Sequence, residues 1–231
     1  SAASDVYKRQ DYGIAVSGDG VFSTPERDVT TVLVPGRNGT LTYDNGRYNN
    51  VQIRYVCGIQ SDFKAKFAAF RAALPKGQYC RLEDTYFPDH FRLGMLSGGI
   101  EPQLIGAYWE SGQFDILFDC KPQLFRKDGE TPVTFNSPGA LYNTGETALP
   151  LLTVYGSGSG TVTVGTETMQ ITAIDGYVVI DCSTQDAYKG LSNKNSTIKA
   201  AEFPELGPGE NPVSWTGGVT KVEIIPRWWT L

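Results

Sequence analysis

The sequence is poor in metal-binding and redox side chains. It contains a single histidine, His90, and four cysteines that are far apart and form no Cys-x-x-Cys pair. Zinc and iron–sulfur centres need several such ligands at suitable spacing, so no metal and no cofactor are expected. Each cysteine lies in or beside a strand-like run, where a free thiol behaves as a small hydrophobe. An even count also allows two disulfides, but we predict four reduced cysteines: Cys57, Cys80, Cys120 and Cys182.

Long apolar runs and blocks of positive charge are missing as well. No stretch approaches the ~20 apolar residues that span a bilayer, so no membrane insertion is expected. The 20 lysines and arginines are outnumbered by 25 acidic residues, and no basic stripe suggests nucleic-acid recognition. Hydrophobic residues make up 40% of the chain, which is enough for a packed core, and its 26 glycines and 13 prolines cluster between short apolar runs. This pattern favours a β-dominated fold.

The motifs of common catalytic sites are also scarce. His90 follows Asp89, but a hydrolase triad also needs a nucleophile on a sharp turn, and the sequence has no Gly-x-Ser-x-Gly motif. The GSGSG run at 156–160 resembles a phosphate loop, yet a strand-like Thr-Val-Thr-Val follows it where a phosphate loop needs a helix. We therefore interpret this run as a flexible hairpin turn and His90 as a polar residue at a strand edge.

Acidic residues leave one enzymatic alternative open. Glycosidases need two carboxyl groups roughly 5–10 Å apart, and carboxylates recur within 83–89 and at Asp115 and Asp119. A hydrolase would hold two buried carboxylates of raised pKa in one cleft. We expect solvated surface carboxylates instead, and we predict no catalytic residue.

The most informative segment is 32–59, in which two Asn-Gly pairs adjoin apolar or β-branched runs. Asn-Gly adopts positive φ at little cost and is the strongest short signal for a tight hairpin turn. Asn38-Gly39 and Asn45-Gly46 therefore predict the order strand, turn, short strand, turn, strand. The segment carries no nucleophile, metal ligand set or phosphate loop, so a structural role is expected.

One α-helix is expected at 61–74. Phe63, Phe67, Phe70 and Leu74 recur at the spacing of one helix face, Ser61 is the expected N-cap, and the Pro-Lys-Gly that follows ends the helix. Strands are expected around it at 12–16, 78–83, 90–97, 103–107 and 112–120.

A domain boundary is predicted in the polar segment 121–131, which contains a proline and an Asp-Gly pair. We assign 11–125 to an N-terminal domain and 126–231 to a C-terminal β-sandwich, because only short alternating strands follow the boundary. These strands are expected at 149–155, 160–164, 168–173, 177–181, 203–206, 212–216 and 219–225. Residues 1–10, SAASDVYKRQ, match the translation of a transposon-based sequencing adapter. We exclude them from fold prediction and expect the natural N-terminus to be missing.

Three tryptophans lie near the C-terminus: Trp215, Trp228 and Trp229. Their rings suit stacking on sugars, as in carbohydrate-binding sandwiches, and equally suit closing a core or an interface. A module that recognises host cell-surface glycans is therefore the alternative function, and core or interface packing is the preferred interpretation.

Several segments together resemble the distal tail protein (Dit) family of long, non-contractile-tailed bacteriophages. The N-terminal resemblance covers 22–48, above all ERDVTTVLVPGRNGTLTYDNGRY, and is followed by the helix and by RLEDTYFPDHFRLG. The C-terminal resemblance is FPELGPGENPVSWTGGVTKVEIIPRWW, residues 203–229. In this order the segments cover essentially all of 12–229.

The resemblance implies a mainly β fold, with a β-rich N-terminal belt domain that carries one helix and a C-terminal galectin-like β-sandwich. It further implies a homohexameric ring, the baseplate hub, which joins the tail tube protein to the tail-associated tip protein and to baseplate or receptor-binding proteins. Such a protein is located in the virion at the tail tip and, during assembly, in the host cytoplasm. The resemblance implies no enzyme activity.

If the chain forms a ring, the turns of the 32–59 segment would shape an edge that faces a neighbouring subunit or the tube. Arginine is enriched at interfaces and pairs bidentately, so two arginines are expected to be interface anchors, with a solvated hairpin tip as the alternative. The predicted interface residues are Pro35, Gly36, Arg37, Asn38, Gly39 and Arg47.

Overall fold

The computed structural model describes residues 9–18, 20–75, 77–105 and 110–231, and its chain divides into two compact units between Gln123 and Leu124. The predicted domain boundary lies two residues further on, between residues 125 and 126. Of the predicted adapter segment, residues 1–8 lie outside the described residues, whereas Arg9 and Gln10 begin the 3₁₀ helix η1 (Arg9–Tyr12). The chain is mainly β, as predicted, with one α-helix in the part that the structure describes.

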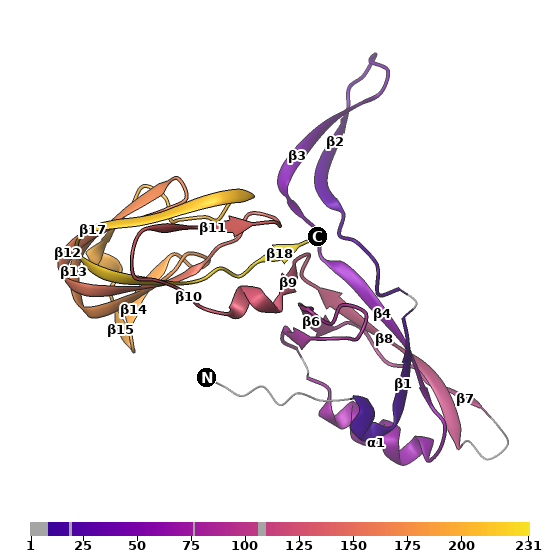
Figure 1. The fold of residues 1–231 in the computed structure, drawn as a ribbon. Helices are drawn as coiled ribbons and strands as arrows, with labels where there is room; N and C mark the ends of the chain where they lie inside the picture. The colour runs from indigo at the N-terminus through magenta and orange to yellow at the C-terminus, as the bar shows by residue number, and fades with distance from the viewer. Residues whose placement is uncertain (1–8, 19, 76, 106–109) are drawn as a thin grey trace. The chain divides into compact units, whose positions relative to one another are not determined.

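The first unit contains an antiparallel sheet in the order β1-β4-β8-β6, with β5 beside β6 and β7 beside β8 (Figure 1). Its inward-facing side chains alternate with exposed ones, as in β4, where every second residue is buried. The strands are β1 (Ile14–Ser17), β4 (Val51–Ile59), β5 (Cys80–Leu82), β6 (His90–Leu96), β7 (Gln103–Ile105) and β8 (Ser111–Cys120). Each overlaps a predicted strand, and the end of the strand predicted at 103–107 lies outside the described residues.

Helix α1 (Phe63–Ala73) buries the aromatic face that its sequence predicts. The rings of Phe67 and Phe114 of β8 pack edge to face with centroids 5.0 Å apart, which joins the helix to the sheet. The predicted N-cap is wrong: Asp62 occupies that position with φ 55° and caps through no side-chain hydrogen bond. The first helical amide, Phe63 N–H, donates instead to the carbonyl of Glu110 at 3.1 Å, so a neighbouring loop replaces the cap.

Strands β2 (Arg27–Leu33) and β3 (Thr40–Tyr48) form a two-stranded antiparallel sheet of their own, which we call the arm (Figure 1). Asn38-Gly39 lies in the loop that joins the two strands, as predicted. The second predicted turn is wrong, because Asn45-Gly46 lies within β3. There β3 places three residues opposite the single residue Asp28 of β2, so the Asn-Gly pair forms a bulge in a continuing strand.

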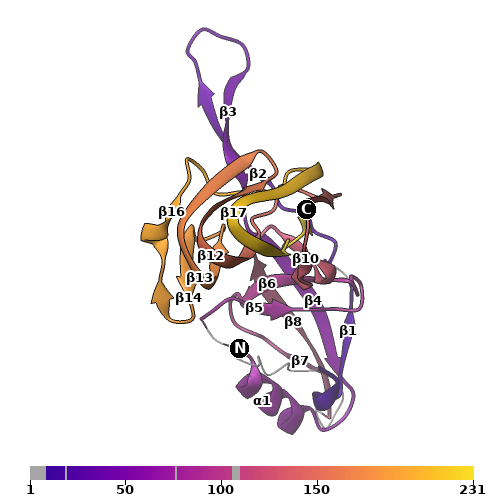
Figure 2. The same cartoon turned by 60° about the vertical axis from the view of Figure 1, so that its left-hand side comes forward.

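The second unit contains an eight-stranded sheet in the order β10-β17-β12-β13-β14-β15, with β11 beside β17 and β16 beside β13. Figure 2 shows its long strands curving round, and one face of the sheet supplies the core of the unit. The strands are β10 (Val133–Phe135), β11 (Gly139–Asn143), β12 (Leu151–Val164), β13 (Glu167–Asp181), β14 (Asp186–Lys189), β15 (Ser192–Asn193), β16 (Ile198–Lys199) and β17 (Gly209–Ile225). Strand β9 (Leu124–Arg126) pairs with β18 (Trp229–Thr230), and two short 3₁₀ helices, η2 (Lys127–Glu130) and η3 (Asn195–Thr197), complete the unit.

Three glycine-containing gaps between the predicted strands are bends within long strands. The GSGSG run, which was predicted to be a hairpin turn, lies inside β12, residues 175–176 lie inside β13, and residues 217–218 lie inside β17. The three sites are adjacent in the sheet, since Gly156 faces Gly176 on one side and Val219 on the other, with register shifts beside it. A Cβ on Gly218 would lie 1.8 Å from the carbonyl oxygen of Ser157, so two backbones approach here as only glycine permits.

Candidate interaction surface

The arm exposes apolar side chains to solvent. Every residue from 29 to 47 is exposed, and the exposed fraction is 50% for Val32, 49% for Leu41 and 69% for Tyr43. An isolated two-stranded ribbon is marginally stable in water, and contiguous exposed apolar surface marks interaction sites. The arm therefore has the properties of a segment that is completed by a partner.

Cross-strand pairing sorts the arm into two faces. Directly opposed residues of an antiparallel pair point to the same side, so the pairs Thr30–Tyr43 and Val32–Leu41 share one face. We call this the apolar face of the arm: Thr30, Val32, Leu41 and Tyr43. The other face carries the pairs Val29–Asp44, Thr31–Thr42 and Leu33–Thr40, so threonines there alternate with two exposed aliphatic side chains.

Five of the predicted interface residues form the tip of the arm. The loop closes on itself through the Arg37 N–H, which donates to the carbonyl of Val34 at 3.2 Å. Gly36 and Gly39 have φ of 78° and 81°, the left-handed region that favours glycine. A Cβ on either would meet no atom within 4 Å, so these glycines serve the turn and leave the tip open. Pro35, Gly36, Arg37, Asn38 and Gly39 are all exposed.

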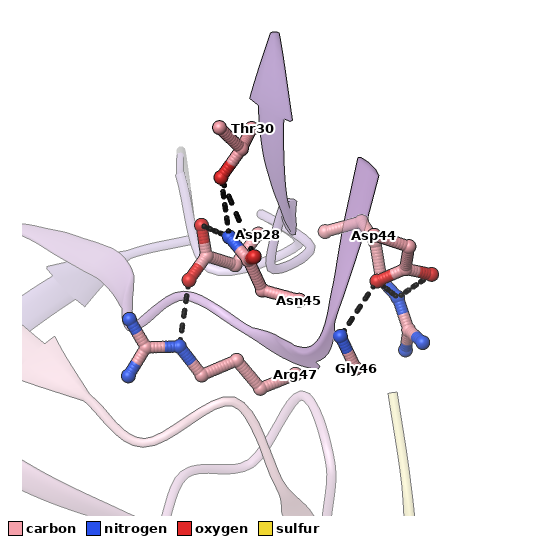
Figure 3. Close-up of polar contacts among 7 residues, drawn as sticks. Asp28, Thr30, Asp44, Asn45, Gly46 and Arg47 are labelled. Atoms are coloured by element: carbon pink, nitrogen blue, oxygen red, sulfur yellow. Dashed lines mark hydrogen bonds and ion pairs between the residues drawn. The ribbon is translucent and has the colours of Figure 1, made fainter. Parts of the chain in front are cut away.

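The structure does not bring Arg47 to this tip. It lies at the base of the arm, where its Nε forms an ion pair with Asp28 Oδ2 at 2.6 Å (Figure 3). The Asn45 side-chain amide donates to the same carboxylate at 3.1 Å and to Thr30 Oγ1 at 3.1 Å. These two donors, Arg47 first, lower the pKa of Asp28. Arg47 thus fixes the base of the arm, and its role as an interface anchor stays a prediction.

A second ion pair, between Arg27 and Asp44, stabilises the same bulge. Asp44 Oδ1 accepts the Gly46 N–H at 2.8 Å, and Arg27 Nε donates to both oxygens of the Asp44 carboxylate at 2.9 and 3.0 Å. The Gly46 amide and then Arg27 lower the pKa of Asp44. We call Arg27, Asp28, Thr30, Asp44, Asn45 and Arg47 the clasp. Sequence reasoning missed its acidic members, although Asp44 two residues before a glycine is a recognisable Asx-turn signal.

A second exposed apolar feature, the aromatic patch, lies where the segment after β1 meets the segment after β5. It consists of Phe22, Tyr86 and Phe87. Phe22 is 65% exposed even though its ring packs edge to face on Tyr86 and Phe87, with centroids 6.0 and 5.5 Å apart. Because Phe22 and Tyr86 are far apart in the sequence, no local pattern predicts this patch.

An apolar cavity of about 380 Å³ adjoins the patch, and Tyr86 is among the residues that line it. Arg9 and Gln10, from the segment predicted to be adapter-derived, also line it. The Tyr55 hydroxyl donates to Asp84 Oδ2 at 2.6 Å on its wall, and burial followed by this hydrogen bond raises the pKa of Tyr55 well above its usual value. Burial also raises the pKa of the Cys57 thiol to about 12, so that this lining residue is a protonated thiol at neutral pH. The cavity therefore supplies mainly apolar surface, and its Cys57 thiol is not activated.

The side chains considered for catalysis or metal binding are dispersed. His90 begins β6 and packs edge to face on Phe87, while Asp115 pairs with Arg54 at 2.9 Å. Asp119 accepts hydrogen bonds from Asn50 and from the Tyr79 hydroxyl, both at 2.7 Å. Within the described residues, no three His, Cys, Asp or Glu side chains are grouped to hold a metal ion, and no helix is long and apolar enough to cross a membrane. All four cysteines are free thiols, as predicted.

The three tryptophans that were considered for core packing or glycan contact lie against the core of the second unit. Trp228 is buried among the core side chains, and Trp215 and Trp229 are half-buried against them. The Trp229 indole N–H donates to the carbonyl of Thr147 at 2.9 Å. These contacts are those of packing side chains.

Solved structures show the same fold. The chain is similar to the Dit protein of phage SPP1, described as a paradigm of the hub adsorption apparatus in phages that infect Gram-positive bacteria. The TM-score is 0.70 at 11% identity, over 91% of this chain and 90% of that one. It is also similar to a chain of the phage p2 baseplate in its activated conformation, with a TM-score of 0.52 at 8% identity, over 97% and 93% of the two chains. The chain has the fold of SPP1 Dit and of this p2 baseplate chain. No protein-family model and no curated protein sequence matches it.

Proposed function

We propose that this chain is the distal tail protein of a long, non-contractile-tailed phage or prophage and that it forms a homohexameric ring. The observation that carries the proposal is the arm, whose exposed apolar face needs a partner. The fold shared with SPP1 Dit and with the p2 baseplate chain supports a hub role. In this proposal no reaction is catalysed.

A ring follows from the kind of contact that the arm can make. A projecting arm and the surface that receives it are different patches of one chain, so their contact can repeat head to tail from one copy to the next. Head-to-tail contacts close into a ring when the rotation between subunits divides a full turn, and otherwise they give filaments. The proposed ring joins the tail tube to the tail-associated tip protein and to receptor-binding proteins, at the virion tail tip, after assembly in the host cytoplasm.

The test is the mass of the purified chain in solution. Light scattering coupled to size exclusion is expected to give a particle of six times the chain mass of 25.2 kDa. A strict monomer at high concentration would overturn self-assembly as proposed. A variant with the tip loop 34–39 replaced by a two-residue Asn-Gly turn is the internal control for the arm, because such a turn closes a hairpin without the native tip.

A further inference from the structure

Hydrogen bonds and close packing hold the residues of the aromatic patch in position. The backbone amides of Tyr86 and Phe87 donate to Asp84 Oδ1 at 2.9 and 3.0 Å, and the other oxygen of that carboxylate accepts the Tyr55 hydroxyl. A Cβ on Gly18 would lie 2.4 Å from the ring of Tyr86, so the segment after β1 packs closely against that ring. An exposed aromatic surface that is already ordered loses little conformational entropy on binding, which is the property of an interface hot spot.

Only a short segment separates the aromatic patch from the arm in the sequence. Phe22 precedes β2 by only five residues, so the patch lies beside the base of the arm. The seven residues of β2 extend the ribbon by roughly 23 Å at about 3.3 Å per residue. Paired strands hold that extension, and the ribbon shows β2 and β3 projecting as a separate hairpin (Figure 1).

We propose that the apolar face of one copy's arm packs on the aromatic patch of the next copy. This inference rests on the proposed ring and names the surface that accepts the arm. Phe22 and Tyr86 would contact Val32, Leu41 and Tyr43, and the adjoining apolar cavity continues the same surface inward. A cavity of about 380 Å³ has room for an aliphatic side chain.

Other exposed apolar residues make poorer acceptors. In the first unit, Leu104 and Ile105 lie on the three-residue strand β7 and present two aliphatic side chains. In the second unit, Tyr142 and Leu191 are scattered singly, which is usual for protein surfaces. The aromatic patch differs from these exposed apolar groups of the described residues because it combines several aromatic rings with an adjoining cavity.

Photocrosslinking in the full chain tests the inference. Tyr43 is replaced by p-benzoyl-phenylalanine, and the chain is mixed with isotope-labelled copies so that crosslinks between copies are recognised by mass spectrometry. The expected crosslinks join the probe to residues 18–26 or 82–87 of another copy. The matched control places the probe at Thr42, on the opposite face of the same strand, and is expected to lose at least nine tenths of these crosslinks.

The outcomes separate the two proposals. Crosslinks to β7, to the second unit or to the probe's own chain, in a particle that still assembles, would overturn the acceptor surface and leave the ring intact. Absence of any oligomer would overturn both. Phe22→Ser with Tyr86→Ser is expected to raise the concentration needed for assembly at least tenfold, whereas Leu191→Ser is expected to leave it unchanged. Assembly of the patch variant at the wild-type concentration would also overturn the proposal.

Discussion

Removing the two aliphatic side chains at the centre of the arm's apolar face is expected to weaken assembly without unfolding the chain. Val32 and Leu41 are directly opposed in the arm, and each keeps about half of its surface exposed. Full burial of such a side chain contributes about 1.5–3 kcal/mol, so burying the remaining half contributes roughly 0.8–1.5 kcal/mol each. Val32→Ser with Leu41→Ser therefore costs about 1.5–3 kcal/mol per contact between subunits, or roughly a 10–100-fold loss of affinity.

Sedimentation velocity over a concentration series measures this loss. The double variant is expected to dissociate at concentrations where the wild-type chain stays assembled, while circular dichroism and the Tm of the monomer stay close to wild type. Thr31→Ser with Thr42→Ser alters the opposite face of the same strands and is the matched control. Equal assembly of the apolar-face variant and the control would refute the assignment of this face to an interface.

Three further predictions concern the clasp and the second unit. Asp28→Ala removes the acceptor shared by Arg47 and Asn45, so hydrogen exchange at the base of the arm is expected to rise severalfold while exchange in the main sheet stays unchanged. Gly218→Ala places a Cβ against the Ser157 carbonyl and is expected to lower the free energy of unfolding by roughly 2–4 kcal/mol in urea titrations, and an unchanged midpoint would contradict the close approach. Asp181 forms a bidentate ion pair with Arg227, which lowers its pKa in the folded state. Its contribution to stability is therefore present above the unfolded-state pKa of about 3.9 and is lost as the pH falls below it, so Asp181→Asn should flatten the acid dependence of Tm, and an unaltered pH profile would count against this.

Local periodicity predicted much of the first unit. The phenylalanines of 61–74 define one helix face whatever surrounds them, and the helix ends within two residues of its predicted limits. Its N-cap could not be predicted, because the amide that Ser61 was expected to cap is satisfied by Glu110, from a distant part of the chain. Local patterns carry no information about such partners.

Glycine signals were correct in one place and misleading in others. Asn38-Gly39 lies in the loop between β2 and β3, where the two paired strands end and the chain reverses direction. The same dipeptide at Asn45-Gly46 forms a bulge, because Asp28 and Arg27 on the facing strand hold the surplus residues in place. In the second unit, glycines permit bends where strands pack backbone to backbone, and a single sequence gives no sign that the strand continues.

The candidate site was predictable only in part. The exposed tip, 35–39, follows from turn chemistry, and the structure places it at the end of the arm. Arg47 was expected at a second turn as an interface anchor, and the structure pairs it with Asp28 of the facing strand at the base of the arm. The aromatic patch escapes sequence reasoning altogether, because Phe22 and Tyr86 meet only after the segments that follow β1 and β5 have packed together.

Electron microscopy of the assembled chain tests the central claim most directly. Negative-stain images of the largest particle are expected to show closed rings with six subunits, and these rings should disappear in the Val32→Ser, Leu41→Ser variant. Open filaments, particles without rotational symmetry, or monomers alone at high concentration would contradict the account of this chain as a self-assembling tail hub.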